Sequence, residues 1–187
     1  MNVVSTIKMT ARQFLELGED PVGVRLELVD GEVAVSPSPI PNHSRVVVQL
    51  TIILGNHIVT HDLGELFQDV DTILDDYDVR RPDILFFDKG RLNLVGRKAM
   101  EGPPDLAIEV LSPSSVKTDR VDKFEQYQQA GVKHYWIIDP ELKKIEAWSL
   151  QDKKFVEEGR GQGTAVVRFQ PFVDLDIPLS RLWRNEQ

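Results

Sequence analysis

Glu109 is a carboxylate in the middle of an apolar run, Leu106-Ala107-Ile108-Glu109-Val110-Leu111. Such a run is typical of a central strand covered on both faces, where a carboxylate is costly unless it is paired or bound to a metal. In a strand, Glu109 shares one face with Asp105, Ala107 and Leu111. The sequence therefore predicts either a bound cation or a buried basic partner. The second would make Glu109 a structural, salt-bridged residue.

Asp83 follows Pro82 at the mouth of a second apolar segment, Ile84-Leu85-Phe86-Phe87. It stands 26 positions before Glu109, with a loop between them, so the two strands can lie side by side. Two carboxylates from adjacent strands form the hard-oxygen site that Mg²⁺ or Mn²⁺ prefers. A Pro-Asp turn with no chemical role is the alternative interpretation.

Lys123 lies on a helix expected from about Lys117 to Ala130 and ended by Gly131. Asp119, Lys123 and Tyr127 form one row on this helix, spaced i, i+4 and i+8. A lysine beside a metal-bound water can position or deprotonate it, and can neutralise charge that builds on phosphate. A solvated helix lysine paired with Asp119 is the alternative.

The elements that must position these residues follow from periodicity and turn signals. Asp30-Gly31 between two alternating segments indicates a tight β-hairpin, and apolar residues with a period near 3.6 indicate an amphipathic helix. The order predicts an α/β fold: a mixed central sheet flanked by helices, in one domain spanning residues 1–187. The expected elements are a helix at Thr10–Leu17, a hairpin at Val24–Val29 and Glu32–Ser36, a helix over about 44–61, strands at Leu66–Leu74, Val79–Phe87, Leu106–Leu111, His134–Pro140, Ile145–Leu150 and Thr164–Phe169, a loop over 88–104, and a tail over 171–183 without clear periodicity.

Composition narrows the class of protein. The 187 residues are 41% hydrophobic and 28% charged, which excludes a disordered or fibrous chain. The absence of cysteine excludes disulfides and zinc-thiolate sites. The sequence has no apolar run that predicts a membrane span and no basic leader that predicts a signal peptide. We therefore expect a cytoplasmic protein. A net charge of −8 argues against coating nucleic acid by bulk electrostatics. Residues 80–133, with 10 basic and 8 acidic side chains, are the net-basic part.

Several separated segments together resemble the PD-(D/E)XK nuclease superfamily and, more narrowly, the Uma-type family of predicted restriction endonucleases. The resemblance covers roughly residues 10–180 and implies a restriction endonuclease-like core at about 43–140, preceded by the N-terminal helix and hairpin. The matching segments are Leu26–Glu32, Ser36–His43, Arg81–Ile84, Asp105–Pro113, Asp119–Lys123 and Ala130–Trp136.

This resemblance assigns roles to the candidate residues. Asp83 matches the first motif acid and Glu109 the second, with the Val110 carbonyl helping to hold the metal. Leu111 stands where the superfamily has its lysine, and that role maps to Lys123 on the following helix. Many relatives carry an acid on the first core helix; residues 44–60 contain none, so Gln49 or His43 would have to serve.

Weaker candidates surround this core. His43 could contact phosphate or orient water, although a capping or turn histidine is an equal alternative. Glu27 and Glu32 flank the Asp30-Gly31 turn, and Glu32 is the candidate third acid, unless it is an exposed hairpin residue. Four basic residues could contact phosphates or pair with surface acids: Arg80, Arg81, Lys117 and Arg120.

The resemblance implies a Mg²⁺- or Mn²⁺-dependent endonuclease that acts on DNA, and a homodimer, because double-strand cleavage needs two active sites. The displaced lysine, the missing helix acid and the acidic body favour the alternative of a catalytically inactive binding or assembly module with the same fold. The sequence does not separate cleavage of DNA from cleavage of RNA.

Overall fold

The structure, a computed structural model, describes residues 8–113 and 115–184 and is built around a six-stranded sheet. The strand order is β10-β9-β8-β7-β6-β3, and every neighbouring pair is antiparallel except the parallel pair β7–β8. The predicted mixed sheet flanked by helices is therefore confirmed. The strands are β3 (Gly64–Phe67), β6 (Ile84–Asp88), β7 (Leu106–Val110), β8 (His134–Asp139), β9 (Lys144–Gln151) and β10 (Lys154–Gln162).

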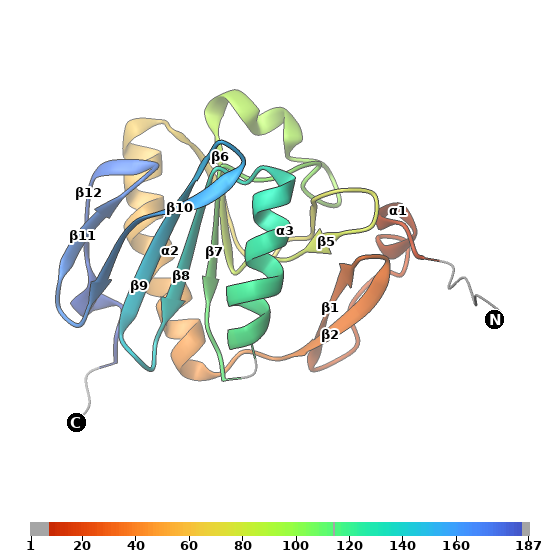
Figure 1. The fold of residues 1–187 in the computed structure, drawn as a ribbon, viewed down its shortest axis with the longest axis horizontal. Helices are drawn as coiled ribbons and strands as arrows, with labels where there is room; N and C mark the ends of the chain where they lie inside the picture. The colour runs from red at the N-terminus through yellow and green to blue at the C-terminus, as the bar shows by residue number, and fades with distance from the viewer. Residues whose placement is uncertain (1–7, 114, 185–187) are drawn as a thin grey trace.

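Helices cover both faces of this sheet, as Figure 1 shows. The buried face of α2 (Pro41–His61) packs on one side, together with the hairpin of β11 (Val166–Phe169) and β12 (Phe172–Pro178) and the short η3 (Leu179–Arg181). The helix α3 (Lys123–Ala130) packs on the other side, through Tyr127. Alternation along β7 sends Ala107 to the α3 side, as the sequence predicts for the face that also carries Glu109.

A second, smaller sheet of order β2-β1-β5-β4 lies beside the α3 face of the main sheet (Figure 1). The hairpin of β1 (Val24–Val29) and β2 (Glu32–Pro37) is confirmed, and both turn residues have positive φ, 50° at Asp30 and 77° at Gly31. Thr10 caps α1 (Ala11–Phe14), which packs on this sheet. The remaining strands are β4 (Thr72–Ile73) and β5 (Val79–Arg80).

Two predicted strands are interrupted in the structure. The strand expected at Leu66–Leu74 divides into β3 and β4, because Asp69 adopts a left-handed conformation at φ 54°. The strand expected at Val79–Phe87 divides at Pro82, which cannot donate a ladder hydrogen bond. Asp83 therefore lies at the junction between the two sheets. The loop expected over 88–104 contains the 3₁₀ helix η1 (Lys89–Leu94).

Two predicted helices begin differently. Helix α2 starts at Pro41 rather than at Ser44, because proline lacks a donor and is favoured in a first helical turn. The helix predicted from Lys117 contains a π-helical turn, η2 (Thr118–Asp122), before α3. Within the described residues, no helix is both long enough and apolar enough to cross a membrane.

The sequence pattern missed β10 and β12. The strand predicted at Thr164–Phe169 is present as β11, which pairs with β12 in a separate ladder. Glycines in β10 explain the first omission. A Cβ on Gly161 would lie 2.4 Å from Val167 and 2.9 Å from Leu179, and one on Gly159 would lie 3.0 Å from Phe169. The glycines weaken the strand pattern but allow the C-terminal hairpin to approach closely.

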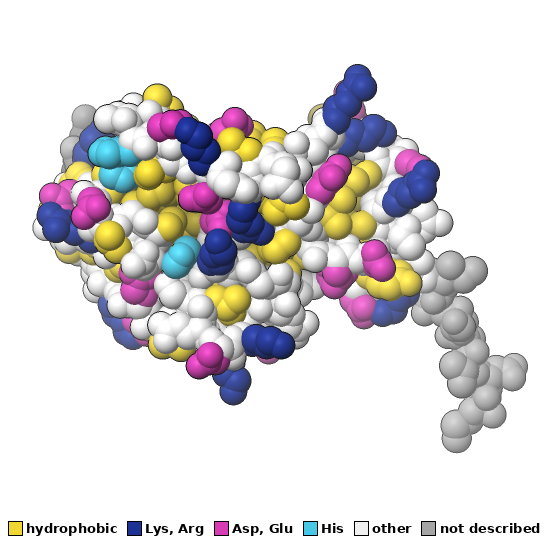
Figure 2. Space-filling model, turned by 90° about the horizontal axis from the view of Figure 1, so that it is seen from above, with side chains coloured by type: hydrophobic (Ala, Val, Ile, Leu, Met, Phe, Trp, Pro, Cys, Tyr) yellow, Lys and Arg dark blue, Asp and Glu magenta, His cyan; other side chains and the backbone are white. Residues whose placement is uncertain are grey.

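Asp105 anchors the end of the sheet at which β7 begins. Its Oδ1 lies 2.7 Å from Lys133 Nζ and 2.9 Å from Arg91 Nη1, and its Oδ2 accepts the Asp88 N–H at 2.8 Å. Burial opposes the charge, but these donors lower the pKa of Asp105 below its usual value. Figure 2, which views the molecule from this end, shows basic and acidic side chains interspersed on the surface.

Asp105→Asn is expected to lower the free energy of unfolding by about 1–3 kcal/mol at neutral pH, since it weakens three charge-assisted contacts. A carboxyl group whose pKa is depressed by folding stabilises the protein above its unfolded-state pKa and loses that effect as pH falls through the folded-state pKa. The difference between wild type and variant should therefore shrink below about pH 4. Urea titrations at neutral and acidic pH measure it, with exposed Asp122→Asn as control. A difference in unfolding free energy that does not change with pH would contradict the role of ionised Asp105 in stabilising the fold.

Candidate active site

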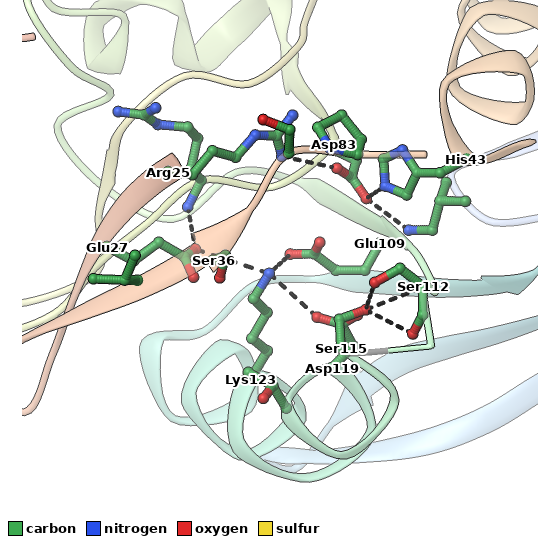
Figure 3. Close-up of a pocket in the computed structure, with 16 residues that line it drawn as sticks. Arg25, Glu27, Ser36, His43, Asp83, Glu109, Ser112, Ser115, Asp119 and Lys123 are labelled. Atoms are coloured by element: carbon green, nitrogen blue, oxygen red, sulfur yellow. Dashed lines mark hydrogen bonds and ion pairs between the residues drawn. The ribbon is translucent and has the colours of Figure 1, made fainter. Parts of the chain in front are cut away.

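A cavity of about 300 Å³ lies where β6 begins, β7 ends and α3 begins, and β1 and the first turn of α2 close its other sides. Figure 3 shows the acidic and basic side chains pointing toward one another inside it. The structure brings together five of the residues predicted for the catalytic and metal site: His43, Asp83, Glu109, Val110 and Lys123. Asp119 and Arg81, also named from sequence, line the same cavity.

Glu109 is 2% exposed and is held from two sides through the same oxygen. Its Oε1 accepts a hydrogen bond from the Tyr127 hydroxyl at 2.7 Å and lies 3.0 Å from Lys123 Nζ. Burial raises the pKa of Glu109, and the neighbouring carboxylates of Asp119 and Asp83 act in the same direction. The sequence allows either a bound cation or a buried basic side chain beside this carboxylate, and the buried basic side chain is present as Lys123.

Asp83 is held by three donors at the junction of β5 and β6. Its Oδ2 accepts the Val110 N–H at 2.8 Å and lies 2.9 Å from His43 Nε2. Its Oδ1 lies 3.3 Å from Arg25 Nη1. Burial works against ionisation, but the hydrogen bond and charge of His43 together with Lys123 lower the pKa of Asp83. Asp83 is therefore a buried, ionised carboxylate with His43 as its closest side-chain partner.

Lys123 lies among three carboxylates. Its Nζ is 3.0 Å from Glu109, 3.2 Å from Asp119 and 3.8 Å from Glu27. Burial opposes the ammonium charge, but these acids outweigh it and raise the pKa of Lys123. The alternative of a solvated helix lysine is wrong, because the side chain is 10% exposed and faces the cavity. The predicted Asp119 partner is present.

Glu27, rather than Glu32, is the further acid at the site. Glu27 is buried, accepts the Arg81 N–H at 2.9 Å and lies 3.1 Å from Arg80 Nη1. Glu32 pairs with Val29 at the turn end of the hairpin, is exposed and lies outside the cavity, so its selection as the third acid is corrected. Alternation places both glutamates on the same face of the hairpin. They differ in distance from the turn, and this distance decides which of them reaches the cavity; the periodicity of the sequence does not predict it.

The basic residues proposed as phosphate contacts are mostly committed to internal pairs, the alternative considered from sequence. Arg80 binds Glu27 and Gln126, Arg81 binds Asp20 and Asp71, and Arg120 binds Glu146. Lys117 is exposed beside the π-helical turn. Gln49, the other candidate for the missing helix acid, lies further along α2 outside the cavity, whereas His43 lines it. Arg25 and Ser115, which no sequence motif marks as site residues, also line the cavity.

The donor set fits a hard divalent cation. Asp83 and Glu109 supply carboxylates, and the Val110 carbonyl faces the same side of β7 as its N–H, because both groups of one residue in a strand point to the same neighbour. Within the described part of the chain, no group of three or more histidine, cysteine or acidic side chains is arranged as a metal site. Two carboxylates with water and substrate oxygens are, however, the coordination that Mg²⁺ commonly takes.

Comparison with protein families identifies the family of this chain. The model of the Uma2 family, described as "Putative restriction endonuclease", matches residues 11–180. The chain belongs to the Uma2 family. This confirms the family inferred from the separated sequence motifs. A search of curated proteins finds no match to this Uma2 chain.

A solved structure shares the fold of this Uma2 protein. It is the crystal structure at 1.96 Å of a "putative nuclease belonging to DUF820" from Anabaena variabilis ATCC 29413. The two chains are 21% identical and superpose with a TM-score of 0.76, covering 93% of the present chain and 97% of the other. At this identity the likeness establishes the fold, so the activity of the Uma2 chain is argued from its own residues.

Proposed function

We propose that the chain is a divalent-metal-dependent endonuclease that hydrolyses phosphodiester bonds of DNA. The observation that carries this proposal is the convergence of Asp83, Glu109 and Lys123 in one cavity of a chain from a restriction endonuclease family. Two buried acids beside a buried ammonium group are more than packing requires, since each charge is costly to bury. Phosphodiester hydrolysis uses both kinds of charge, because carboxylates bind the metal cation and an ammonium group stabilises the negative charge of the phosphate.

Asp83, Glu109 and the Val110 carbonyl would hold Mg²⁺ or Mn²⁺. The bound cation would supply Lewis-acid polarisation of the phosphate. His43 supports the Asp83 carboxylate from the first turn of α2, and Tyr127 supports Glu109 from α3, so both acids are held before substrate binds. Lys123, as an ammonium group beside Glu109, would orient the attacking water and neutralise charge that develops on the phosphate.

Cleavage of plasmid DNA in Mg²⁺ and in Mn²⁺, with EDTA as the blank, tests the proposal directly. We expect nicked and then linear product with either metal and none with EDTA. Glu32→Gln should cleave at the wild-type rate, because that exposed acid lies outside the cavity. Glu27→Gln should be slower, because it removes a charge that helps to fix Lys123.

Absence of metal-dependent cleavage across many DNA sequences would favour the alternative, an inactive nuclease fold that serves as a binding or assembly module. We also propose that two copies act together, since cutting both strands of a duplex needs two active sites. Light scattering of the purified protein should then give the mass of a dimer. A monomer that linearises plasmid by paired cuts would contradict this second proposal.

A further inference from the structure

Arg25 is a cationic side chain at the cavity that the proposed mechanism does not use. It projects from β1, on the same face as Glu27, and its side chain is 24% exposed. Its Nη1 lies 3.3 Å from Asp83 Oδ1, and its Nη2 lies 3.1 Å from Asp69 Oδ2. The guanidinium therefore bridges a buried acid of the site and an acid at the surface. Figure 3 shows Arg25 and Asp83 at the cavity.

The attachments of Arg25 are weaker than those of the other cations around the cavity. Arg81 binds Asp20 at 2.5 Å and Asp71 at 2.9 Å, and Lys123 lies 3.0 Å from Glu109. The Asp69 partner of Arg25, by contrast, is 44% exposed, and partly exposed ion pairs contribute little to stability. Giving up the Asp69 contact is therefore inexpensive, whereas the contact with buried Asp83 is given up only when another cation takes its place.

A guanidinium on Asp83 competes with any cation that uses the same carboxylate. Metal binding at Asp83 and Glu109 would place a second positive charge near Arg25 and weaken its contact with Oδ1. A phosphodiester entering the cavity brings oxygens to the same place, and the planar fork of a guanidinium matches phosphate oxygens through two parallel hydrogen bonds.

We infer that Arg25 is a phosphate-binding residue that serves as the counter-ion of Asp83 while the metal is absent and transfers to a non-bridging oxygen of the substrate phosphate when metal and nucleic acid bind. The inference rests on the proposed function. It differs from a purely structural ion pair in predicting opposite effects on the two ligands. Loss of Arg25 should strengthen metal binding and weaken nucleic-acid binding.

The test compares wild type with Arg25→Gln and Arg25→Lys. Titration with Mn²⁺ alone, followed by calorimetry, should show binding to Arg25→Gln tighter by on the order of 3- to 10-fold, because a competing cation is gone. The affinity for a short DNA duplex, measured by fluorescence anisotropy with Ca²⁺ in place of Mg²⁺, should fall by about 10-fold or more. For both ligands, the affinity of Arg25→Lys should lie between those of wild type and Arg25→Gln, since lysine keeps the charge but not the planar fork of the guanidinium.

Arg168→Gln is the control. Arg168 pairs with Asp176 in the C-terminal hairpin, both side chains are 61% exposed, and neither residue lines the cavity. Weaker Mn²⁺ binding by Arg25→Gln would overturn the inference and make Arg25 a structural support of Asp83. Unchanged binding of both ligands would overturn it as well. The Mn²⁺ titration needs no cleavage, so it still tests Arg25 if the wild-type protein proves unable to hydrolyse DNA.

Discussion

Glu109→Gln is expected to slow metal-dependent DNA cleavage by at least about 10²-fold, because it removes one of two carboxylates that would hold the cation. Glutamine keeps the shape of the side chain, and its amide oxygen can still accept from Tyr127 and Lys123. Lys123 keeps Asp119 and Glu27 as partners, so the fold should be retained. Initial rates at saturating Mg²⁺, with the melting temperature measured in parallel, separate loss of chemistry from loss of structure.

Glu146→Gln is the control for Glu109→Gln. Glu146 is also a buried glutamate, but on β9 outside the cavity, where it pairs with Arg120 and Lys144. Its substitution should lower stability somewhat and leave the rate per folded molecule unchanged. If Glu109→Gln cleaves as fast as wild type, the two-carboxylate account of the site is wrong.

Lys123→Met is expected to cost about 3–5 kcal/mol of stability, the range found when one partner of a buried charge cluster is removed. Methionine is similar in length but leaves Glu27, Glu109 and Asp119 with no ammonium among them. Chemical denaturation at neutral pH measures the loss. Lys89→Met should change stability by less than about 1 kcal/mol, since its pair with Asp62 is largely exposed.

The double variant Lys123→Met/Glu109→Gln decides whether the effect arises from the ion cluster. Removing both charges should cost less than the sum of the single variants, with a coupling of about 1–3 kcal/mol, because the two groups are in direct contact. Strict additivity would mean that the contact between Lys123 and Glu109 does not contribute to the stabilising effect of Lys123.

The sequence alone was sufficient to predict that Asp83 and Glu109 lie at neighbouring strands. An apolar run around Glu109 and another after Asp83 predict neighbouring strands, and β6 and β7 are antiparallel neighbours with Ile84 opposite Ile108. The predicted row of Asp119, Lys123 and Tyr127 is present despite the π-helical turn. Lys123 and Tyr127 contact Glu109 on β7, and Asp119 contacts Lys123.

What escaped the sequence depends on long-range placement. Glu27 and Arg25 reach the cavity because the hairpin packs against the strand junction at Asp83, 58 positions away from Arg25 in the chain. Local alternation gives the face of a strand but not its distance from a site on another element. The same limit explains the strands missed near Gly159 and Gly161, whose glycines serve packing against a hairpin that comes later in the chain.

Thermal unfolding as a function of Mn²⁺ concentration, for wild type, Asp83→Asn and Glu109→Gln, tests the central claim most directly. A cation that binds the folded state raises the melting temperature, and no substrate is needed. Each titration is run with and without a short DNA duplex, whose phosphates can complete the coordination. The account predicts metal-dependent stabilisation of wild type that is lost in both variants. Stabilisation that persists in both variants, or is absent from wild type under both conditions, would contradict it.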